Sequence, residues 1–302
     1  MKFKMKTRPS SFFPILLLFA LCSMPYLTKA QGLESIDQDP NGEIIWYNAL
    51  DIGLTGQFWD VLDQPFDRLP AKAKGVVRDA VWYLGTNTAG LSVHFRTNST
   101  KLWAKWTVRY DNSMWHMTDA GIKGVDLYMN DQGKWLYAGT GSPSGKSNQR
   151  QILRGMDGEV HDYHMNLPLY DGLDTLWIGV EEGSLIEPHS LLEGKPLLIY
   201  GTSIQQGGCA SRPGMAASNI ISRQLNREVI NLGFSGNGRM EMELAELIAE
   251  IDAYAYIFDC LPNLHNLEVI YPLYMEFVHF IREKHPNTPI FLVETATTVK
   301  SA

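Results

Sequence analysis

The chain has 302 residues, of which 45% are hydrophobic and 20% are charged, and these proportions exclude a fibrous or largely disordered protein. Its length is enough for about two domains. The formal net charge is −7. It becomes −12, from 21 basic and 33 acidic residues, when residues 1–30 are set aside, because they hold five basic residues and no acidic one. A chain this acidic is not expected to bind nucleic acid or an anionic membrane surface.

The first 30 residues have the layout of a secretory signal peptide. A positively charged start at residues 2–8 precedes an apolar run at residues 12–21, and Thr28-Lys29-Ala30 forms a cleavage site of small residues. The alternatives are an uncleaved membrane anchor and a lipid anchor on Cys22. The apolar run is shorter than the roughly 20 residues that span a bilayer. We therefore predict a cleaved signal at residues 1–30, a periplasmic or extracellular location, and no stable membrane insertion.

Residues 32–192 have the rhythm of short β-strands separated by turns. The turn Asn130-Asp131-Gln132-Gly133 lies between two apolar runs and indicates a hairpin. All eight tryptophans fall in this part of the chain. The pattern predicts an all-β sandwich, jelly-roll-like in type and without a helix of its own. The strands that we expect cover residues 44–47, 91–96, 103–110, 125–129, 135–138 and 176–180.

The rhythm changes at Pro196, where apolar runs begin to alternate with helical spacing. We expect strands at residues 197–200, 229–232, 255–258 and 290–293, and helices at residues 215–226, 240–251 and 271–284. Continuously apolar strands that alternate with helices predict a parallel sheet with helices on both faces, a three-layer α/β domain over residues 196–302. In such a sheet the functional groups follow the carboxyl ends of the strands.

Three segments follow these strand ends. Ser203 comes after the first strand, where a serine either presents its hydroxyl as a nucleophile or caps a helix. Gly236 lies in a glycine-rich loop after the second strand, where backbone can approach a ligand closely. Asn263 follows the third strand, and its side-chain amide either donates to an oxyanion or forms a turn. Each segment alone is compatible with a structural role.

Together these segments resemble the SGNH hydrolases, also called the GDSL esterase and lipase superfamily. In addition, Gly124-Val125-Asp126-Leu127-Tyr128 is similar to the Gly-x-Asp-Leu-Tyr signature of a β-sandwich that precedes one branch of that family. The resemblance implies that Ser203 attacks an ester carbonyl. It also implies that the N–H groups of Ser203 and Gly236 and the side chain of Asn263 form the oxyanion hole. Thr202 departs from the aspartate found in many relatives.

The resemblance also implies a catalytic histidine with an aspartate three residues before it, in a late loop. No Asp-x-x-His follows Ser203, so the catalytic His and Asp are not present in this chain, and His265, His279 and His285 are poor substitutes. We expect a C-terminal truncation that removes a fifth strand, a final helix and this loop. We accordingly predict that the 302-residue form has little or no esterase activity.

These observations predict an exported serine esterase that removes acetyl or short acyl groups from a glycan or other small molecule. The alternative is a glycan-binding protein with a degenerate hydrolase domain. Serine-based ester cleavage needs no cofactor, and we see no metal-binding cluster in the sequence. Arg212 either contacts a substrate oxygen or stabilises its loop. Cys209 and Cys260 either pair or remain separate thiols. The sequence carries no signal for a particular oligomeric state.

Overall fold

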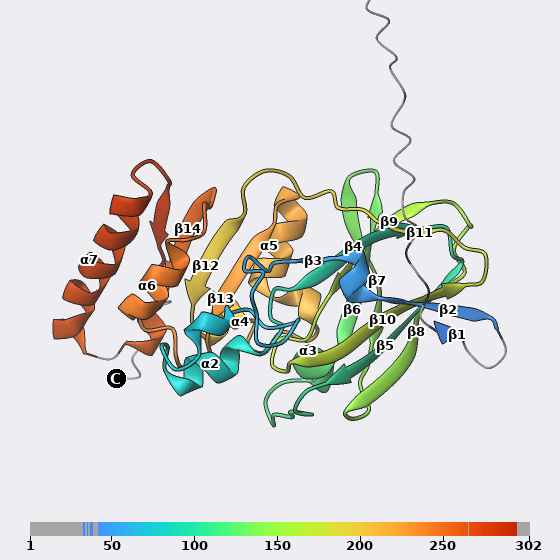
Figure 1. Ribbon diagram of the computed structural model, residues 1–302, viewed down its shortest axis with the longest axis horizontal. Helices are drawn as coiled ribbons and strands as arrows, with labels where there is room; N and C mark the ends of the chain where they lie inside the picture. Colours follow the sequence, from blue (N-terminus) through green and yellow to red (C-terminus); the bar gives the residue numbers. More distant parts are fainter. Residues whose placement is uncertain (1–32, 34, 36, 39–41, 265, 295–302) are drawn as a thin grey trace, which may run out of the picture. The chain divides into compact units, whose positions relative to one another are not determined.

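The computed structural model describes residues 33, 35, 37–38, 42–264 and 266–294, and the predicted signal peptide lies outside them (Figure 1). All the described residues belong to one structural unit. Among these residues, no helix combines the length and apolar character needed to cross a membrane.

Two antiparallel sheets form the first part of this unit, which confirms the predicted sandwich. Strand β5 shows why: its alternate residues Leu102, Ala104 and Trp106 are fully buried between the sheets. One sheet has the order β1-β2-β10-β5-β8, and the other has the order β11-β4-β9-β6-β7 with β3 paired to β4. The strands are β1 (Asp37–Gln38), β2 (Ile44–Asn48), β3 (Leu54–Thr55), β4 (Ser92–Thr97), β5 (Lys101–Val108), β6 (Val125–Asp131), β7 (Lys134–Gly141), β8 (Ser147–Arg154), β9 (His161–Asn166), β10 (Leu173–Glu181) and β11 (Ile186–Pro188).

The expectation that this half lacks helices is wrong. It contains α1 (Ala49–Ile52), η1 (Ala71–Ala73), α2 (Asp79–Gly85) and α3 (Asp119–Lys123). These helices are only one or two turns long, too short to establish a repeat of 3.6 residues in the sequence. Local capping supports α3, since the Thr118 hydroxyl accepts a hydrogen bond from the Gly121 N–H.

A parallel sheet with the order β13-β12-β14-β15 forms the second part, as predicted. Strand β12, one of its two inner strands, is buried along its whole length. Leu198 and Tyr200 share a buried cluster with residues of α6 and α7, whereas Leu197 and Ile199 share one with Ile221 of α5. Figure 1 shows α6 and α7 on one side of this sheet and α5 on the other. The elements are β12 (Leu197–Gly201), α4 (Ser203–Gln206), η2 (Pro213–Met215), α5 (Ala217–Leu225), β13 (Val229–Gly233), α6 (Met242–Ile248), β14 (Ala255–Asp259), η3 (Leu261–Asn263), α7 (Leu267–Lys284) and β15 (Ile290–Leu292).

A segment of the N-terminal half enters the core of the parallel sheet. Trp59, Leu69 and Val81 belong to the same buried cluster as Leu198 and Tyr200. This segment lies within the residues 32–192 that the sequence assigns to the sandwich. Two stretches of chain about 130 residues apart therefore share one core.

Arg68 secures that segment from within. Arg68 is 2% exposed, and its guanidinium donates hydrogen bonds to four backbone carbonyls. The acceptors are the oxygens of Leu84, Asn87, Asn231 and Gly233, at 2.7 to 3.1 Å. Burial lowers the pKa of Arg68 to about 9.

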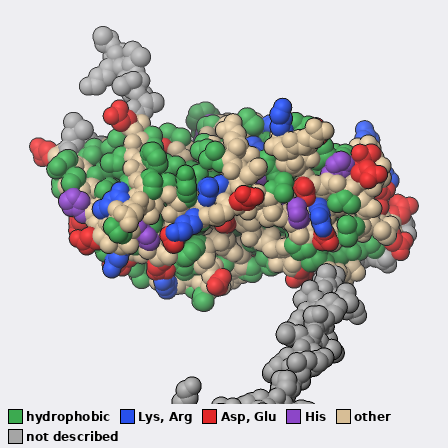
Figure 2. All heavy atoms as spheres, turned by 90° about the horizontal axis from the view of Figure 1, so that it is seen from above, with side chains coloured by type: hydrophobic (Ala, Val, Ile, Leu, Met, Phe, Trp, Pro, Cys, Tyr) green, Lys and Arg blue, Asp and Glu red, His purple; other side chains and the backbone are tan. Residues whose placement is uncertain are grey.

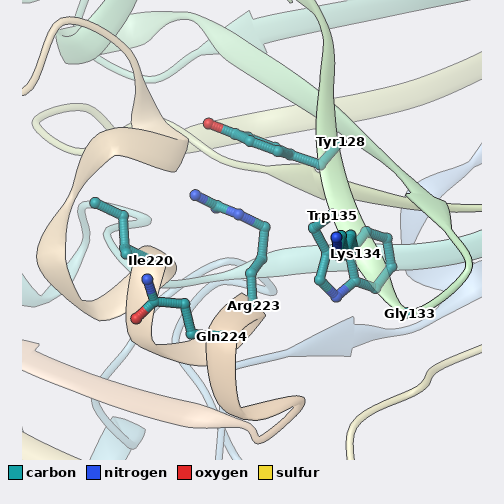
Figure 3. Close-up of a pocket in the computed structure, with 7 residues that line it drawn as sticks. All are labelled: Tyr128, Gly133, Lys134, Trp135, Ile220, Arg223 and Gln224. Carbon is teal, nitrogen blue, oxygen red and sulfur yellow. The ribbon is translucent and has the colours of Figure 1, made fainter.

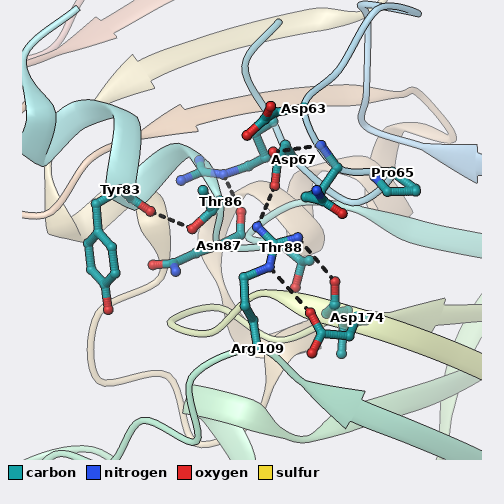
Figure 4. Close-up of polar contacts among 12 residues, drawn as sticks. Asp63, Pro65, Asp67, Tyr83, Thr86, Asn87, Thr88, Arg109 and Asp174 are labelled. Atoms are coloured by element: carbon teal, nitrogen blue, oxygen red, sulfur yellow. Dashed lines mark hydrogen bonds and ion pairs between the residues drawn. The ribbon is translucent and has the colours of Figure 1, made fainter. Parts of the chain in front are cut away.

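The neighbouring Asp67 faces the sandwich. Arg109 lies between two carboxylates, with Nη1 2.7 Å from an oxygen of Asp67 and Nε 3.5 Å from an oxygen of Asp174 (Figure 4). Burial raises the pKa of Asp67, and Arg109 opposes that rise.

On the face seen in Figure 2, acidic and basic side chains are interspersed.

Candidate active site

The three predicted site residues follow neighbouring strands of the parallel sheet. Gly201 at the end of β12 is in register with Gly233 of β13 and with Asp259 of β14. The chain after β13 turns back onto β12, because the Phe234 N–H donates to the Gly201 oxygen at 2.9 Å. The loops that carry Ser203, Gly236 and Asn263 thus start from one edge of the sheet.

Ser203 is the first residue of the short helix α4. The side chain of Thr202, which is fully buried, caps this helix by accepting from the Ile204 N–H at 3.3 Å. A neutral hydroxyl at this position caps the helix without burying a charge. The turn closes where the N–H groups of Gly207 and Gly208 donate to the Ser203 oxygen. Ser203 itself is half-buried and lies in the wall of a pocket of about 470 Å³.

The loop after β13 is held beside Ser203 by Gln206. This side chain is fully buried, and its amide oxygen accepts from the Ser235 N–H at 2.9 Å. Its amide nitrogen donates to the side chain of Asn87 and to the Leu169 oxygen, both at 3.1 Å. One glutamine therefore links the helix that carries the candidate nucleophile to the glycine loop and to the N-terminal half.

Gly236 adopts a φ of 69°, in the left-handed region that favours glycine. A Cβ at this position would meet nothing within 4 Å, so backbone conformation and not space selects glycine. Within the described residues, the N–H groups of Ser203 and Gly236 have no hydrogen-bond acceptor.

Asn263 ends the short helix η3 and contacts the same loop. In the orientation that satisfies its amide, the oxygen accepts from the N–H groups of Asn237 and Gly238 at 3.0 and 3.1 Å. The amide nitrogen then faces away from these two donors. A Cβ on Gly238 would lie 2.1 Å from the Gly201 oxygen. The glycine loop is therefore packed between the end of β12 and Asn263.

The pocket beside Ser203 is completed by the N-terminal half. Met114, His116, Met117 and Tyr170 line it together with Ile204, Gly208, Cys209 and Ser235. The Tyr170 hydroxyl donates to the Ser203 oxygen at 3.3 Å, and burial raises its pKa. Sequence reasoning missed His116, because it lies 87 residues before Ser203 and nothing in the local sequence marks it as part of this pocket.

The other histidines that the sequence analysis considered do not line this pocket. The His285 ring is 2.8 Å from the Ala249 oxygen and 5.3 Å from the ring of Tyr256. His279 is exposed on α7, and His265 lies outside the described residues. The two cysteines that remained open are free thiols, with Cys209 exposed and Cys260 buried.

Arg212 points towards the sandwich and is not among the residues that line the Ser203 pocket. Its Nε is 3.3 Å from a carboxylate oxygen of Asp126, and its guanidinium lies 4.2 Å from the ring centre of Tyr137. Of its two predicted roles, this geometry favours stabilisation of the loop.

Asp126 of the Gly-x-Asp-Leu-Tyr segment holds the same loop from within the interface. It is fully buried, and both of its oxygens accept from the Gly214 N–H, at 3.0 and 2.9 Å. The Asn166 amide donates to it at 2.9 Å. Burial raises its pKa to about 6, against the opposing effects of these hydrogen bonds and of Arg223 and Arg212.

A second pocket of about 360 Å³ lies where the β6–β7 hairpin meets α5 (Figure 3). The guanidinium of Arg223 lies 3.7 Å from the ring centre of Tyr128 and donates to the Gly214 oxygen. The Trp135 indole donates to the side chain of Asn226 at 3.0 Å. Because its lining residues come from the β6–β7 hairpin and from α5, this pocket lies at the contact between the two halves, and it shares no lining residue with the Ser203 pocket.

Two family models match the chain. The model of the GDSL-like lipase/acylhydrolase family matches residues 194–302, and the GxDLY model, described as the N-terminus of SGNH hydrolase-type esterases, matches residues 44–186. A search of curated proteins gave no match.

Several solved structures are similar. A protein from Bacteroides ovatus, described as a GDSL-like lipase, is 38% identical with a TM-score of 0.79, and the match covers 83% of this chain and 74% of that one. The salicylyl-acyltransferase SsfX3 from a tetracycline biosynthetic pathway is 17% identical with a TM-score of 0.60, covering 86% and 72%. A family two carbohydrate esterase from Clostridium thermocellum is 11% identical with a TM-score of 0.51, covering 70% and 72%. Because the last two structures have low sequence identity to this chain, their similarity shows a shared fold and nothing more.

Proposed function

Because the chain belongs to the GDSL-like lipase/acylhydrolase family, we propose that it is a serine ester hydrolase with Ser203 as its nucleophile. The observation that carries this proposal is the meeting of three strand-end loops at one edge of the sheet, with Ser203 in the wall of a pocket. The proposed oxyanion donors are the N–H groups of Ser203 and Gly236 and the amide of Asn263.

In the proposed reaction, the Ser203 oxygen bonds to the ester carbonyl carbon while its proton passes to a base. The bond between that carbon and the alcohol oxygen then breaks, the alcohol leaves with a proton, and the acyl group stays on Ser203. Water attacks the same carbon, releases the carboxylic acid and restores the hydroxyl. Each tetrahedral intermediate carries a negative oxygen, for which one donor is worth about 10²–10³ in rate.

The base determines how fast this chain reacts. The family resemblance assigns that role to a histidine in an Asp-x-x-His motif, and none follows Ser203. A serine hydroxyl without a base is a weak nucleophile. We therefore propose that the 302-residue chain turns esters over slowly and forms an acyl-enzyme most readily with an activated ester.

For the substrate, we propose an acetyl or short-acyl ester of a carbohydrate, met outside the cytoplasm after cleavage of residues 1–30. The pocket volume of about 470 Å³ is sufficient for an acyl group together with part of the sugar that carries it. The net charge of −12 without residues 1–30 supports an uncharged substrate. Expression in a bacterial host followed by N-terminal sequencing tests the export proposal, which predicts a mature chain that begins at Gln31.

Mass spectrometry of the intact chain after incubation with 4-nitrophenyl acetate tests the nucleophile. We expect a single added acetyl group that maps to Ser203 and is absent from Ser203→Ala. Ser211→Ala is the matched control, since Ser211 is an exposed serine of the neighbouring loop. The Ser211→Ala variant should still be acetylated at Ser203.

Acetylation that persists in Ser203→Ala would overturn the proposal. Binding of glycans without any acylation of Ser203, even over hours, would instead favour the alternative of a glycan-binding protein.

A further inference from the structure

The turn at residues 114–117 carries the most exposed large hydrophobic side chain in the described part of the protein. Met114 and Met117 pair through an antiparallel bridge, so Trp115 and His116 occupy the tip of the turn. Trp115 is 97% exposed, and its ring lies 4.9 Å from that of His116 at an angle of 59°. The flat apolar surface of this indole is therefore almost wholly in water.

Both ends of this turn are fixed to the rest of the protein. Asn112 accounts for one end, because its N–H donates to the Asp171 carboxylate and its side chain donates to the Tyr170 oxygen, both at 2.8 Å. At the other end, the Thr118 hydroxyl donates to the Ser211 oxygen at 2.7 Å. The tip is therefore held in place before any ligand arrives, which lowers the entropy lost on binding.

The base of the turn also points to a site. Met117 is 7% exposed and packs in a small buried cluster that includes Leu169 and Tyr170. Met114, His116 and Met117 all line the pocket that contains Ser203. Trp115 lies between Met114 and His116 in sequence, so its turn borders that pocket although Trp115 is not among the residues that line it.

The surroundings of Trp115 indicate the kind of ligand. A sugar ring offers an apolar face of C–H groups and a rim of hydroxyls, which matches a flat indole flanked by hydrogen-bonding groups. The His116 ring lies 4.9 Å from the indole. In the same stretch of chain, Ser113 and Asp119 are exposed polar residues, and the Ser113 hydroxyl donates to the Asp119 carboxylate. A lipid surface would require a broad contiguous apolar patch.

We propose that the turn at residues 114–117 is a carbohydrate subsite, in which Trp115 stacks on the sugar ring that bears the ester and His116 contacts its hydroxyls. This inference rests on the proposed function, and it assigns to the N-terminal half a direct part in substrate selection. It predicts that removal of the indole weakens glycan binding more than it slows attack on an ester without a sugar.

The test compares two measurements on the 302-residue chain. Binding of acetylated xylo-oligosaccharides and of acetylated manno-oligosaccharides is measured by titration calorimetry in the Ser203→Ala background, where no ester is consumed. Acylation by 4-nitrophenyl acetate is measured with Ser203 intact. We expect Trp115→Ala to weaken binding of at least one oligosaccharide by roughly tenfold more than it slows acylation.

Two further variants separate stacking from a general loss of structure. Trp115→Phe keeps an aromatic face and should recover most of the affinity. Tyr271→Ala is the matched control, since Tyr271 is 72% exposed on α7 and is not among the residues that line the Ser203 pocket, and it should change neither measurement.

Three results would overturn the subsite. These are an unchanged oligosaccharide affinity in Trp115→Ala, an equal decrease in binding and acylation, and a Trp115-dependent binding to phosphatidylcholine vesicles with none to either oligosaccharide. Failure of the proposed function is distinguishable, because it would appear as a lack of acylation at Ser203 while the binding result stands by itself.

Discussion

The carboxyl-end edge of the parallel sheet and the sandwich face that packs beside it are both rich in polar groups. At the edge, Ser203 is half-buried in a pocket wall, and the N–H groups of Ser203 and Gly236 have no acceptor within the described residues. At the interface, Asp126 and Gln206 are fully buried and hydrogen-bonded on several sides. The N–H groups at the edge remain available to a substrate, whereas the side chains at the interface are already hydrogen-bonded within the protein.

This difference assigns separate tasks to the two regions. Asp126 holds the loop at Gly214, and Gln206 holds the loop at Ser235, which lines the same pocket as the candidate nucleophile. Substitutions in the interface should therefore lower the free energy of unfolding, and substitutions at the edge should lower the rate of acylation. The predictions below test that separation.

The largest effect is expected for Arg68→Met. The variant leaves four buried carbonyl oxygens without their donor, and each unsatisfied group carries a cost. We expect the free energy of unfolding to fall by on the order of 4 kcal/mol. Urea denaturation followed by tryptophan fluorescence measures it.

Arg78→Met is the control for Arg68→Met. Arg78 pairs with Glu241 and donates to the side chain and the backbone oxygen of Asn237 at a partly exposed site, where each such contact is worth at most about 1 kcal/mol. A loss for Arg68→Met no greater than that for Arg78→Met would contradict a structural role for the buried guanidinium.

Asn263→Ala should act on the rate. It removes a proposed oxyanion donor, and we expect acylation by 4-nitrophenyl acetate to slow by about 10²–10³. Asn266→Ala is a matched control in the same loop, because Asn266 caps α7 by accepting from the Glu268 N–H. Loss of that cap should cost about 1 kcal/mol of stability and leave the rate unchanged. Similar rates for the two variants would remove Asn263 from the proposed site.

The elements of the parallel sheet could be predicted because buried parallel strands are continuously apolar and the intervening helices are long. The same order predicts that the segments with Ser203, Gly236 and Asn263 start from one edge of the sheet, whereas the roles proposed for these three residues come from the family resemblance. Helix α7 begins at Leu267, four residues before the expected start, because Asn266 caps it and Pro272 does not end it. Pro272 lies inside the helix, where its missing N–H removes one hydrogen bond without ending the helix.

Long-range packing could not be predicted in this way. Nothing in the local pattern around Trp59 or Leu69 shows that this segment enters the other core. Likewise, the sequence is compatible with two roles for Arg212, and its contact with Asp126 in the structure favours stabilisation of the loop. The sequence also does not show that the turn with Trp115 and His116 lies at the Ser203 pocket, because only the fold brings these distant segments together.

Asp126→Asn tests the interface through the pH dependence of the free energy of unfolding. The pKa of Asp126 is about 6 in the folded protein, above its ordinary value of 3.8, because of burial. Between about pH 4 and pH 6 the folded state keeps a proton that the unfolded state has lost, so this group's contribution to stability decreases as the pH rises. Relative to Asp126→Asn, the native protein should lose on the order of 2–3 kcal/mol between pH 4 and pH 7.

Urea denaturation across that pH range measures this difference. Val125→Ala is a control on the same strand, since Val125 is fully buried and does not titrate. Its destabilisation of about 2 kcal/mol should be independent of pH. A native protein that gains stability relative to Asp126→Asn as the pH rises would reverse the sign and refute the burial argument.

The smallest effect is expected for Gly236→Ala, which tests how strongly the rate of acylation depends on the conformation of the loop at the sheet edge. The variant keeps the proposed N–H donor and meets no neighbour within 4 Å, so only the φ of 69° opposes it, at a cost of about 1 kcal/mol. Acylation should therefore slow only a few-fold, far less than in Asn263→Ala. Gly238→Ala, whose Cβ would lie 2.1 Å from the Gly201 oxygen, should displace the whole loop and slow acylation much more. Equal rates for the two alanine variants would show that the edge tolerates movement of this loop, and the oxyanion role of Gly236 would then fail.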